Sequence, residues 1–199
     1  MSAIFIPPDY FRELRREEIF PDPLRPLEIE LGCGDGTFLT EMAARHPERD
    51  FLGVERMRGR VVKTARKIAA RNLDHARVMR LESAYTVAWL LPSSCVSRLH
   101  LLCPDPWPKK KHAARRLVNQ DEFLTGLARV LAPGGEFLLK TDDLPYFEDA
   151  LASLESRGSS FERLAWEEDS FYYPTTDFEQ SWLDLGRVIY RARWRLRAR

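Results

Sequence analysis

The chain has 199 residues, of which 44% are hydrophobic and 31% charged, a composition typical of a globular protein with one core. No apolar run is long enough to span a bilayer, and residues 1–9 lack the basic start and cleavage site of a secretion signal, so we expect a cytoplasmic protein without a membrane segment. The net charge of +1 hides a segregation, since residues 119–185 hold 4 Lys and Arg against 15 Asp and Glu, whereas residues 186–199 hold six Arg and no acid. A nucleic-acid partner is therefore not excluded, because local patches set the electrostatic field.

Cysteine and histidine give no sign of a metal site. The three cysteines are an odd number without metal or redox spacing, which favours reduced thiols. The four histidines are scattered without ligand spacing. These residues are Cys33, Cys95, Cys103, His46, His75, His100 and His112.

The N-terminal part is predicted to form a short amphipathic helix over residues 9–20, with Arg12, Arg15 and Arg16 pointing outward and Pro21 and Pro23 closing it. We expect residues 1–25 to be a helical appendage and residues 26–199 to form the catalytic core of a single domain.

An alternation of strands and helices begins at residue 27. Strands are predicted over 27–31, 50–55, 77–81, 99–103, 136–140, 161–166 and 187–194. Helices are predicted over 37–45, 61–70, 122–131 and 145–154, with a further short helix ending at Leu91. This order predicts an α/β, doubly wound fold, in which helices cover both faces of a mostly parallel, seven-stranded sheet. Ligands of such sheets bind beyond the carboxyl ends of the strands.

Three glycines, Gly32, Gly34 and Gly36, separate the first predicted strand from the first helix. Glycine permits positive φ and lets a ligand approach the backbone closely. Glu30 lies in the strand just before them, and Glu55 ends the next strand, 19 residues after Gly36, where an acid can accept hydrogen bonds from ribose hydroxyls. The glycines alone fit a plain turn, but together with both glutamates they favour a cofactor site.

The segments E-L-G-C-G-D-G (30–36) and L-G-V-E (52–55) resemble the S-adenosylmethionine site of class I methyltransferases, which have a Rossmann-like fold. The resemblance implies S-adenosylmethionine as cofactor and a further contact after the third strand, made by Glu82 or Ser83; for Glu82, a surface loop acid is the alternative. The implied cofactor-binding residues are Glu30, Gly32, Gly34, Gly36, Glu55, Glu82, Ser83 and Asp105.

The segment 104–116 reads P-D-P-W-P-K-K-K-H-A-A-R-R and directly follows the strand predicted over 99–103. Proline fixes its own φ and restricts the preceding residue, so this loop is expected to be stiff. It presents Asp105 and Trp107 and then five cations. Trp107 either stacks on a base or packs in the core, and the cations either bind phosphates or are a solvated face.

This segment closely resembles the signature of the bacterial tRNA (guanine-N7)-methyltransferases. Two later motifs also resemble that family: Thr141-Asp142 with Tyr146, and T-D-F-E over 176–179, so the resemblance runs from about residue 26 to residue 190. It implies that Asp105 is catalytic. It further implies substrate binding by Lys109, Asp142, Thr176, Asp177, Phe178 and Glu179, and RNA binding by Lys110, Lys111, Arg115 and Arg116. Q-S-W (180–182) stands where the family usually has a basic residue and a glycine, so local RNA contacts are expected to differ.

The implied activity is methyl transfer from S-adenosylmethionine to N7 of a guanosine in the variable loop of tRNA (position 46 of the tRNA), by a monomer or homodimer without a metal. Guanine N7 has a free lone pair and no proton, so alignment and electrostatics suffice without a general base. The alternatives are a methyltransferase with another substrate and a non-catalytic RNA-binding module. Taken alone, Thr176 and Glu179 also fit a capping box, and Asp142 or Asp143 fits a helix N-cap.

Five arginines near the C-terminus alternate with other residues, which predicts an edge strand with a basic face. Such a face is either a second tRNA contact or a protection against edge-to-edge aggregation. The arginines are Arg187, Arg191, Arg193, Arg195 and Arg197.

Overall fold

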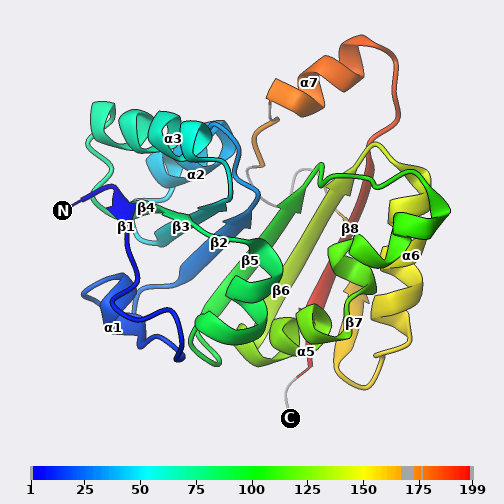
Figure 1. Ribbon diagram of the computed structural model, residues 1–199, viewed down its shortest axis with the longest axis horizontal. Coiled ribbons are helices and arrows are strands. Elements are labelled where there is room, and N and C mark those ends of the chain that lie inside the picture. The colour runs from blue at the N-terminus through cyan, green and yellow to red at the C-terminus, as the bar shows by residue number, and fades with distance from the viewer. Residues whose placement is uncertain (1, 167–172, 176, 198–199) are drawn as a thin grey trace.

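The computed structural model describes residues 2–166, 173–175 and 177–197, and its centre is a sheet of eight strands in the order β1-β4-β3-β2-β5-β6-β8-β7 (Figure 1). The strands are β1 (Ile4–Phe5), β2 (Leu27–Leu31), β3 (Asp50–Glu55), β4 (Ala76–Arg80), β5 (Val96–Leu102), β6 (Leu131–Thr141), β7 (Phe161–Leu164) and β8 (Tyr190–Leu196). Strands β1 to β6 pair in parallel, and β8 runs antiparallel to both β6 and β7. The predicted mostly parallel, doubly wound sheet is confirmed.

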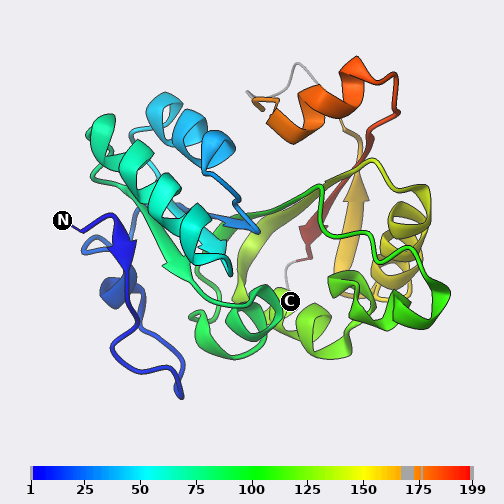
Figure 2. The same ribbon diagram turned by 45° about the horizontal axis from the view of Figure 1, so that its top comes forward.

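Helices cover both faces of this sheet (Figures 1 and 2). The helices are α1 (Arg16–Ile19), α2 (Thr37–Arg45), α3 (Arg58–Ala70), α4 (Ser83–Tyr85), α5 (Asp121–Val130), α6 (Leu144–Glu155) and α7 (Asp177–Asp184). A π-helical turn spans Thr86–Leu90, and 3₁₀ turns span Lys110–Arg115 and Leu117–Asn119. No helix in the described part of the chain is long and apolar enough to cross a membrane.

Two hydrophobic cores hold the layers together, one on each face of the sheet. The first core contains Phe38 of α2, Ile68 of α3 and Phe51 of β3. The second core contains Leu52, the next residue of β3, together with Phe123 of α5. Successive strand residues point to opposite faces, so a strand covered on both sides is apolar throughout.

The N-terminal prediction was wrong in two respects. The helix spans only Arg16–Ile19 rather than residues 9–20, and Arg16 does not point outward: it is buried, and its Nη2 lies 2.5 Å from Oδ2 of Asp50. Asp50 begins β3 and is itself buried, so it requires a cationic partner. Arg16, which is distant from Asp50 in the sequence, is that partner. Its burial therefore differs from the outward position that the amphipathic pattern predicted.

The sheet has eight strands instead of seven because β1 was missed. Only Ile4 and Phe5 form it, and they pair with Val78 and Met79 of β4. Two residues are too few for a periodic signal.

The predicted basic edge strand is not an edge. Strand β8 lies between β6 and β7, and β7 is the edge strand of that side. Glu136 of β6 lies 2.7 Å from Arg193 Nη2 and 3.4 Å from Arg195 Nη2. The Glu136 carboxylate therefore offsets part of the positive charge of the alternating arginines.

Candidate active site

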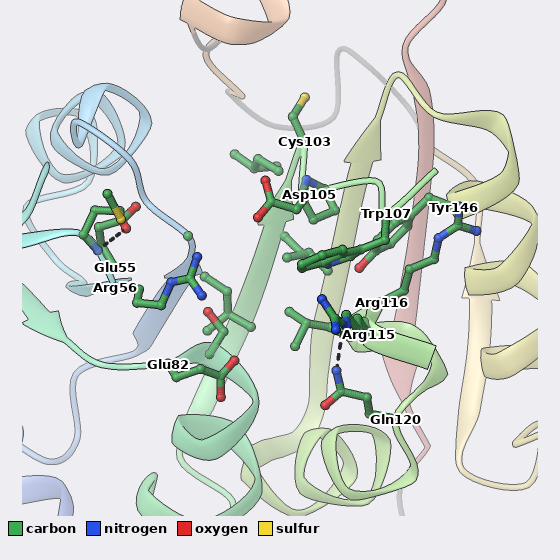
Figure 3. Close-up of a pocket in the computed structure, with 18 of the residues that line it drawn as sticks. Glu55, Arg56, Glu82, Cys103, Asp105, Trp107, Arg115, Arg116, Gln120 and Tyr146 are labelled. Atoms are coloured by element: carbon green, nitrogen blue, oxygen red, sulfur yellow. Dashed lines mark hydrogen bonds between the residues drawn. The ribbon is translucent and has the colours of Figure 1, made fainter. Parts of the chain in front are cut away.

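A cleft of about 240 Å³ opens at the carboxyl ends of β2, β3 and β5, on both sides of the point where the strand order reverses (Figure 3). This is where ligands bind in doubly wound sheets. One wall comes from the loops after β2, β3 and β4, and the other from the loop after β5. The lining residues include Leu31, Gly32, Glu55, Arg56, Met57, Arg60, Glu82, Ser83, Cys103, Pro104, Asp105, Trp107, Arg115, Arg116, Gln120 and Tyr146.

The glycine loop after β2 is shaped by left-handed backbone. Gly32 has φ 69°, and a Cβ there would meet no atom within 4 Å, so the loop leaves open space beside its backbone. Gly36 has φ 80°, and its Cβ would lie 2.5 Å from Cγ2 of Thr64 in α3. Gly32 thus suits a closely approaching ligand, whereas Gly36 is required for the packing of α2 against α3.

Glu55 at the end of β3 fixes this loop and faces the cleft. Its Oε2 accepts the backbone N–H of Gly34 at 3.0 Å, and its Oε1 accepts that of Met57 at 2.7 Å. Each carboxylate oxygen retains a further lone pair. The position fits an acceptor for the two hydroxyls of a ribose.

Glu30 lies deeper than expected and does not line the cleft. Its side chain is buried, and Oε2 has no hydrogen-bond partner in the described part of the chain. Burial, followed by the nearby charges of Asp35 and Glu55, raises the pKa of Glu30 well above its usual value. A buried carboxyl with an unpartnered oxygen thus lies beside the glycine loop.

Glu82 is an N-cap residue as well as a cleft residue. Its carboxylate accepts the backbone N–H groups of Ala84 and Tyr85 at 2.9 and 2.8 Å, which starts helix α4. Figure 3 shows the side chain at the rim of the cleft, and Ser83 lines the cleft beside it.

The proline-rich loop after β5 is held in a strained conformation. Cys103 and Trp107 are not glycines, yet their φ angles are 44° and 46°. Arg116 supports the loop: its Nε donates to the carbonyl of Pro106 at 2.8 Å, and its Nη1 lies 2.8 Å from Asp149. Arg116 is only 5% exposed and its donors already serve the protein, so we leave it out of the proposed phosphate contacts.

Asp105 and Trp107 both face the cleft from this loop (Figure 3). Asp105 is exposed and has no ion pair within the described residues. The guanidinium carbon of Arg115 lies 4.9 Å from the centre of the Trp107 ring, and His112 meets this ring edge-on at 6.0 Å. Trp107 is therefore a half-buried wall residue rather than a core residue.

The expected substrate-binding residues fall into different environments. Asp142 pairs with Arg187 at 2.8 Å, and the neighbouring Asp143 is the N-cap of α6, accepting the N–H of Tyr146 at 2.8 Å. Lys109 and Lys111 are exposed. Thr176 lies outside the described residues, as do the side chains of Lys110, Asp177 and Phe178.

Glu179 is buried rather than open to a ligand. Its exposed fraction is 1%, and both of its oxygens lie 2.9 Å from Nζ of Lys140. The structure therefore does not bring Glu179 to the cleft with Asp105.

Two groups of important residues were not predicted. Arg56 and Arg60 line the wall of the cleft beyond Glu55, and their place directly after that glutamate is a signal in the sequence. Lys140 stands within an apolar strand, a pattern that predicts a buried partner. No cluster of three metal-ligating side chains exists among the residues that the structure covers.

Comparisons with known proteins show similarity in sequence over most of the chain. The family described as "Putative methyltransferase" matches residues 24–192. A tRNA (guanine-N(7)-)-methyltransferase of Syntrophotalea carbinolica is 35% identical over 167 residues, covering 83% of this chain and 72% of the relative. The enzyme of the same name from Lactobacillus johnsonii is 33% identical over 195 residues, covering 95% and 88%.

A solved structure adds evidence for the fold. The 16S rRNA methyltransferase KamB superposes with a TM-score of 0.65 at 18% identity, over 94% of this chain and 96% of that one. The chain is thus similar in fold to a methyltransferase and similar in sequence to a narrower group of them.

Proposed function

The chain belongs to the tRNA (guanine-N7)-methyltransferase family, and we propose that it transfers the methyl group of S-adenosylmethionine to N7 of a guanosine in the variable loop of tRNA. The observation that carries this proposal is the cleft itself: the glycine loop and Glu55 form one wall, and Asp105 and Trp107 face them from the other. The proposal puts the enzyme in the cytoplasm, as a monomer or a homodimer.

The residues present fit S-adenosylmethionine. The open backbone at Gly32 suits close approach of the cofactor, and Glu55 offers acceptors to the ribose. Gly34 and Gly36 shape the loop, Glu82 or Ser83 is proposed to meet the adenine, and the unpartnered Oε2 of Glu30 supports a role for that carboxyl beside the loop. When bound, the cofactor supplies an electrophilic methyl group on a positively charged sulfur.

The protein's part in the reaction is alignment and electrostatics. The lone pair of N7 attacks without losing a proton, so no residue has to act as a base. Positive charge builds up on the guanine ring during transfer, and the Asp105 carboxylate is proposed to stabilise it at the cleft. The stiff loop that carries Asp105 holds this carboxylate in place before the substrate arrives.

We assign RNA binding to four cations of the same loop. Lys109, Lys110, Lys111 and Arg115 are proposed to hold tRNA phosphates, which gives affinity without sequence information. One face of Trp107 is covered by Arg115, so a base is proposed to stack on its other face. Asp142, Thr176, Asp177 and Phe178 stay proposed contacts of the guanine.

The test is an incubation of the purified chain with S-adenosylmethionine and an unmodified tRNA transcript, followed by mass spectrometry of the nucleosides. We expect 7-methylguanosine, and none in a matched transcript that carries 7-deazaguanosine, which lacks N7. Another methylated nucleoside indicates a different substrate atom. Binding of tRNA without binding of S-adenosylmethionine, measured by calorimetry, indicates an RNA-binding module instead.

A further inference from the structure

The C-terminal motif T-D-F-E (176–179) is joined to the sheet by a buried ion pair of its last residue, Glu179. Lys140 lies near the carboxyl end of β6 and is 4% exposed, and its Nζ lies 2.9 Å from each carboxylate oxygen of Glu179 in the first turn of α7. Arg191 of β8 adds a contact of 3.2 Å to Oε1 of the same carboxylate. Figure 1 shows α7 beyond the ends of β5 and β6, so this pair connects α7 to the strand ends that form the site.

A second set of contacts ties the chain just before α7. The ring of Tyr173 lies 4.6 Å from Lys140 Nζ, and its hydroxyl lies 2.9 Å from Nδ1 of His100 in β5. The other ring nitrogen of His100 lies 2.9 Å from Glu28 of β2. Tyr173 and Glu179, which flank Thr176 in the sequence, are thus both attached to buried groups of the sheet.

The environment of Glu179 argues against direct contact with guanine. A side chain that is 1% exposed presents almost no surface to a ligand, and its two oxygens already accept from Lys140 and Arg191. A buried carboxylate is tolerated only when it is paired, and so is a buried ammonium. Burial lowers the pKa of Lys140, and the Glu179 carboxylate opposes this shift. Each of the two charges therefore depends on the other.

We propose that Lys140 and Glu179 are positioning residues of the guanine site: their ion pair fixes the start of α7 beside the end of β6, and the carboxylate of Glu179 does not itself bind the base. Asp142 lies two residues after Lys140 on the same strand end, so the pair also sets the distance between Asp142 and the C-terminal motif. This inference rests on the proposed function. It assigns Glu179 a positioning role in place of the direct substrate contact that the family resemblance implies.

The test compares Lys140→Met, Glu179→Met and the double variant. Methionine is close in size to both side chains, and replacing a buried ion pair by apolar groups of similar volume is often neutral, whereas removal of one partner is strongly destabilising. Each single variant is expected to raise the KM for tRNA at least about tenfold, and the double variant to return it to within about threefold of the wild type. If the Glu179 carboxylate binds guanine, the double variant stays as defective as Glu179→Met, which overturns the proposal.

The controls separate positioning from general damage. Affinity for S-adenosylmethionine, measured by calorimetry, is expected to change less than about twofold in all three variants, because neither Lys140 nor Glu179 lines the cleft. The exposed pair Arg163–Glu155, with a contact of 3.4 Å, receives the same methionine substitutions and is expected to leave the KM unchanged. If a single methionine variant does not fold, Lys140→Arg and Glu179→Gln replace it, with retained and lost activity expected respectively.

The wild type separates failure of the proposed function from failure of the positioning role. Absence of 7-methylguanosine with the wild type contradicts the proposed function. An active wild type with an unrescued double variant contradicts only the positioning role.

Discussion

At Cys103 and Trp107 the backbone adopts φ angles of 44° and 46°, a conformation that costs a non-glycine residue roughly 1–2 kcal/mol. Such strain persists only where the surroundings enforce it, and it is common at functional sites. Here the N–H of Cys103 donates to the carbonyl of Lys140 at 2.8 Å, and Arg116 holds Pro106 from the other side. The loop that presents Asp105 is therefore fixed by buried groups rather than by the prolines alone.

Arg116→Met tests this support. The substitution removes the donors to Pro106, Asp149 and Asp143, so we expect the free energy of unfolding to fall by roughly 2 kcal/mol. Misplacement of Asp105 is expected to lower the methylation rate roughly ten- to hundredfold. Urea unfolding and a rate measurement check both. The control is Arg115→Met, which is expected to change stability by less than about 1 kcal/mol because its contact with Trp107 is exposed.

Glu30 gives a pH dependence of definite sign. Its pKa is raised in the folded state, so the folded protein holds the proton more tightly than the unfolded chain. Above the unfolded pKa of about 4.3, unfolding releases this proton, and rising pH then favours the unfolded state. We expect Glu30→Gln to remove this loss of stability with rising pH. Unfolding free energies of both proteins between pH 4 and pH 8 check it, and parallel curves would contradict the assignment.

At the scale of elements, the bounds of a strand or helix could be predicted where residues close in sequence determine them. The bounds of β2, α2 and β3 agree with the prediction, because a glycine turn and a His46-Pro47 stop separate uninterrupted apolar patterns. The burial of two charged residues, which was not predicted, depends on distant partners. Arg16 is buried in an ion pair with Asp50, and Glu179 in an ion pair with Lys140. Local periodicity does not indicate either pairing.

The position of β8 shows the same limit for topology. Its alternating arginines correctly predicted a strand, but not that β7, which comes earlier in the chain, pairs with it on the outer side. For the site, the sequence pattern predicted Asp105, Glu55 and Glu82 at the ends of strands, and all three line one cleft. It did not reveal that Arg116 and Glu179 are buried.

Gly36→Ala tests the junction between the glycine loop and α3. A Cβ there clashes with Thr64 at 2.5 Å and requires a left-handed alanine, so we expect a loss of stability of roughly 2 kcal/mol or more. The matched control is Gly59→Ala in α3, whose Cβ meets nothing within 4 Å. Alanine there is expected to stabilise the protein by about 0.5–1 kcal/mol. Thermal unfolding of both variants measures the contrast, and equal melting temperatures would refute it.

At the scale of the whole molecule, opposite charges lie on different parts of the chain. Lys109 and Lys111, which follow Asp105 in the loop beside the cleft, are exposed, whereas Glu136 and Asp142 pair with Arg193 and Arg187. The near-zero net charge of the chain therefore results from the acidic residues 119–185 balancing the basic segments before and after them. This distribution suits a polyanion that enters from the side of the proline-rich loop.

Lys111→Ala tests the proposed path of the RNA. Loss of one phosphate contact is expected to weaken tRNA binding and to reduce the slope of log K against log salt by about 1. Arg163→Ala, an exposed cation of the edge strand, is the control and is expected to leave the slope unchanged. Binding titrations at several salt concentrations decide, and equal slopes for wild type and Lys111→Ala would rule out this contact.

The most direct test of the account is the single-turnover rate of 7-methylguanosine formation by Asp105→Asn, at saturating S-adenosylmethionine and tRNA. Asparagine keeps the size of the side chain but removes the charge that is proposed to stabilise the developing cation. We predict a rate at least about 100-fold below that of the wild type. An undiminished rate under these conditions would contradict the central claim that this carboxylate drives methyl transfer to N7.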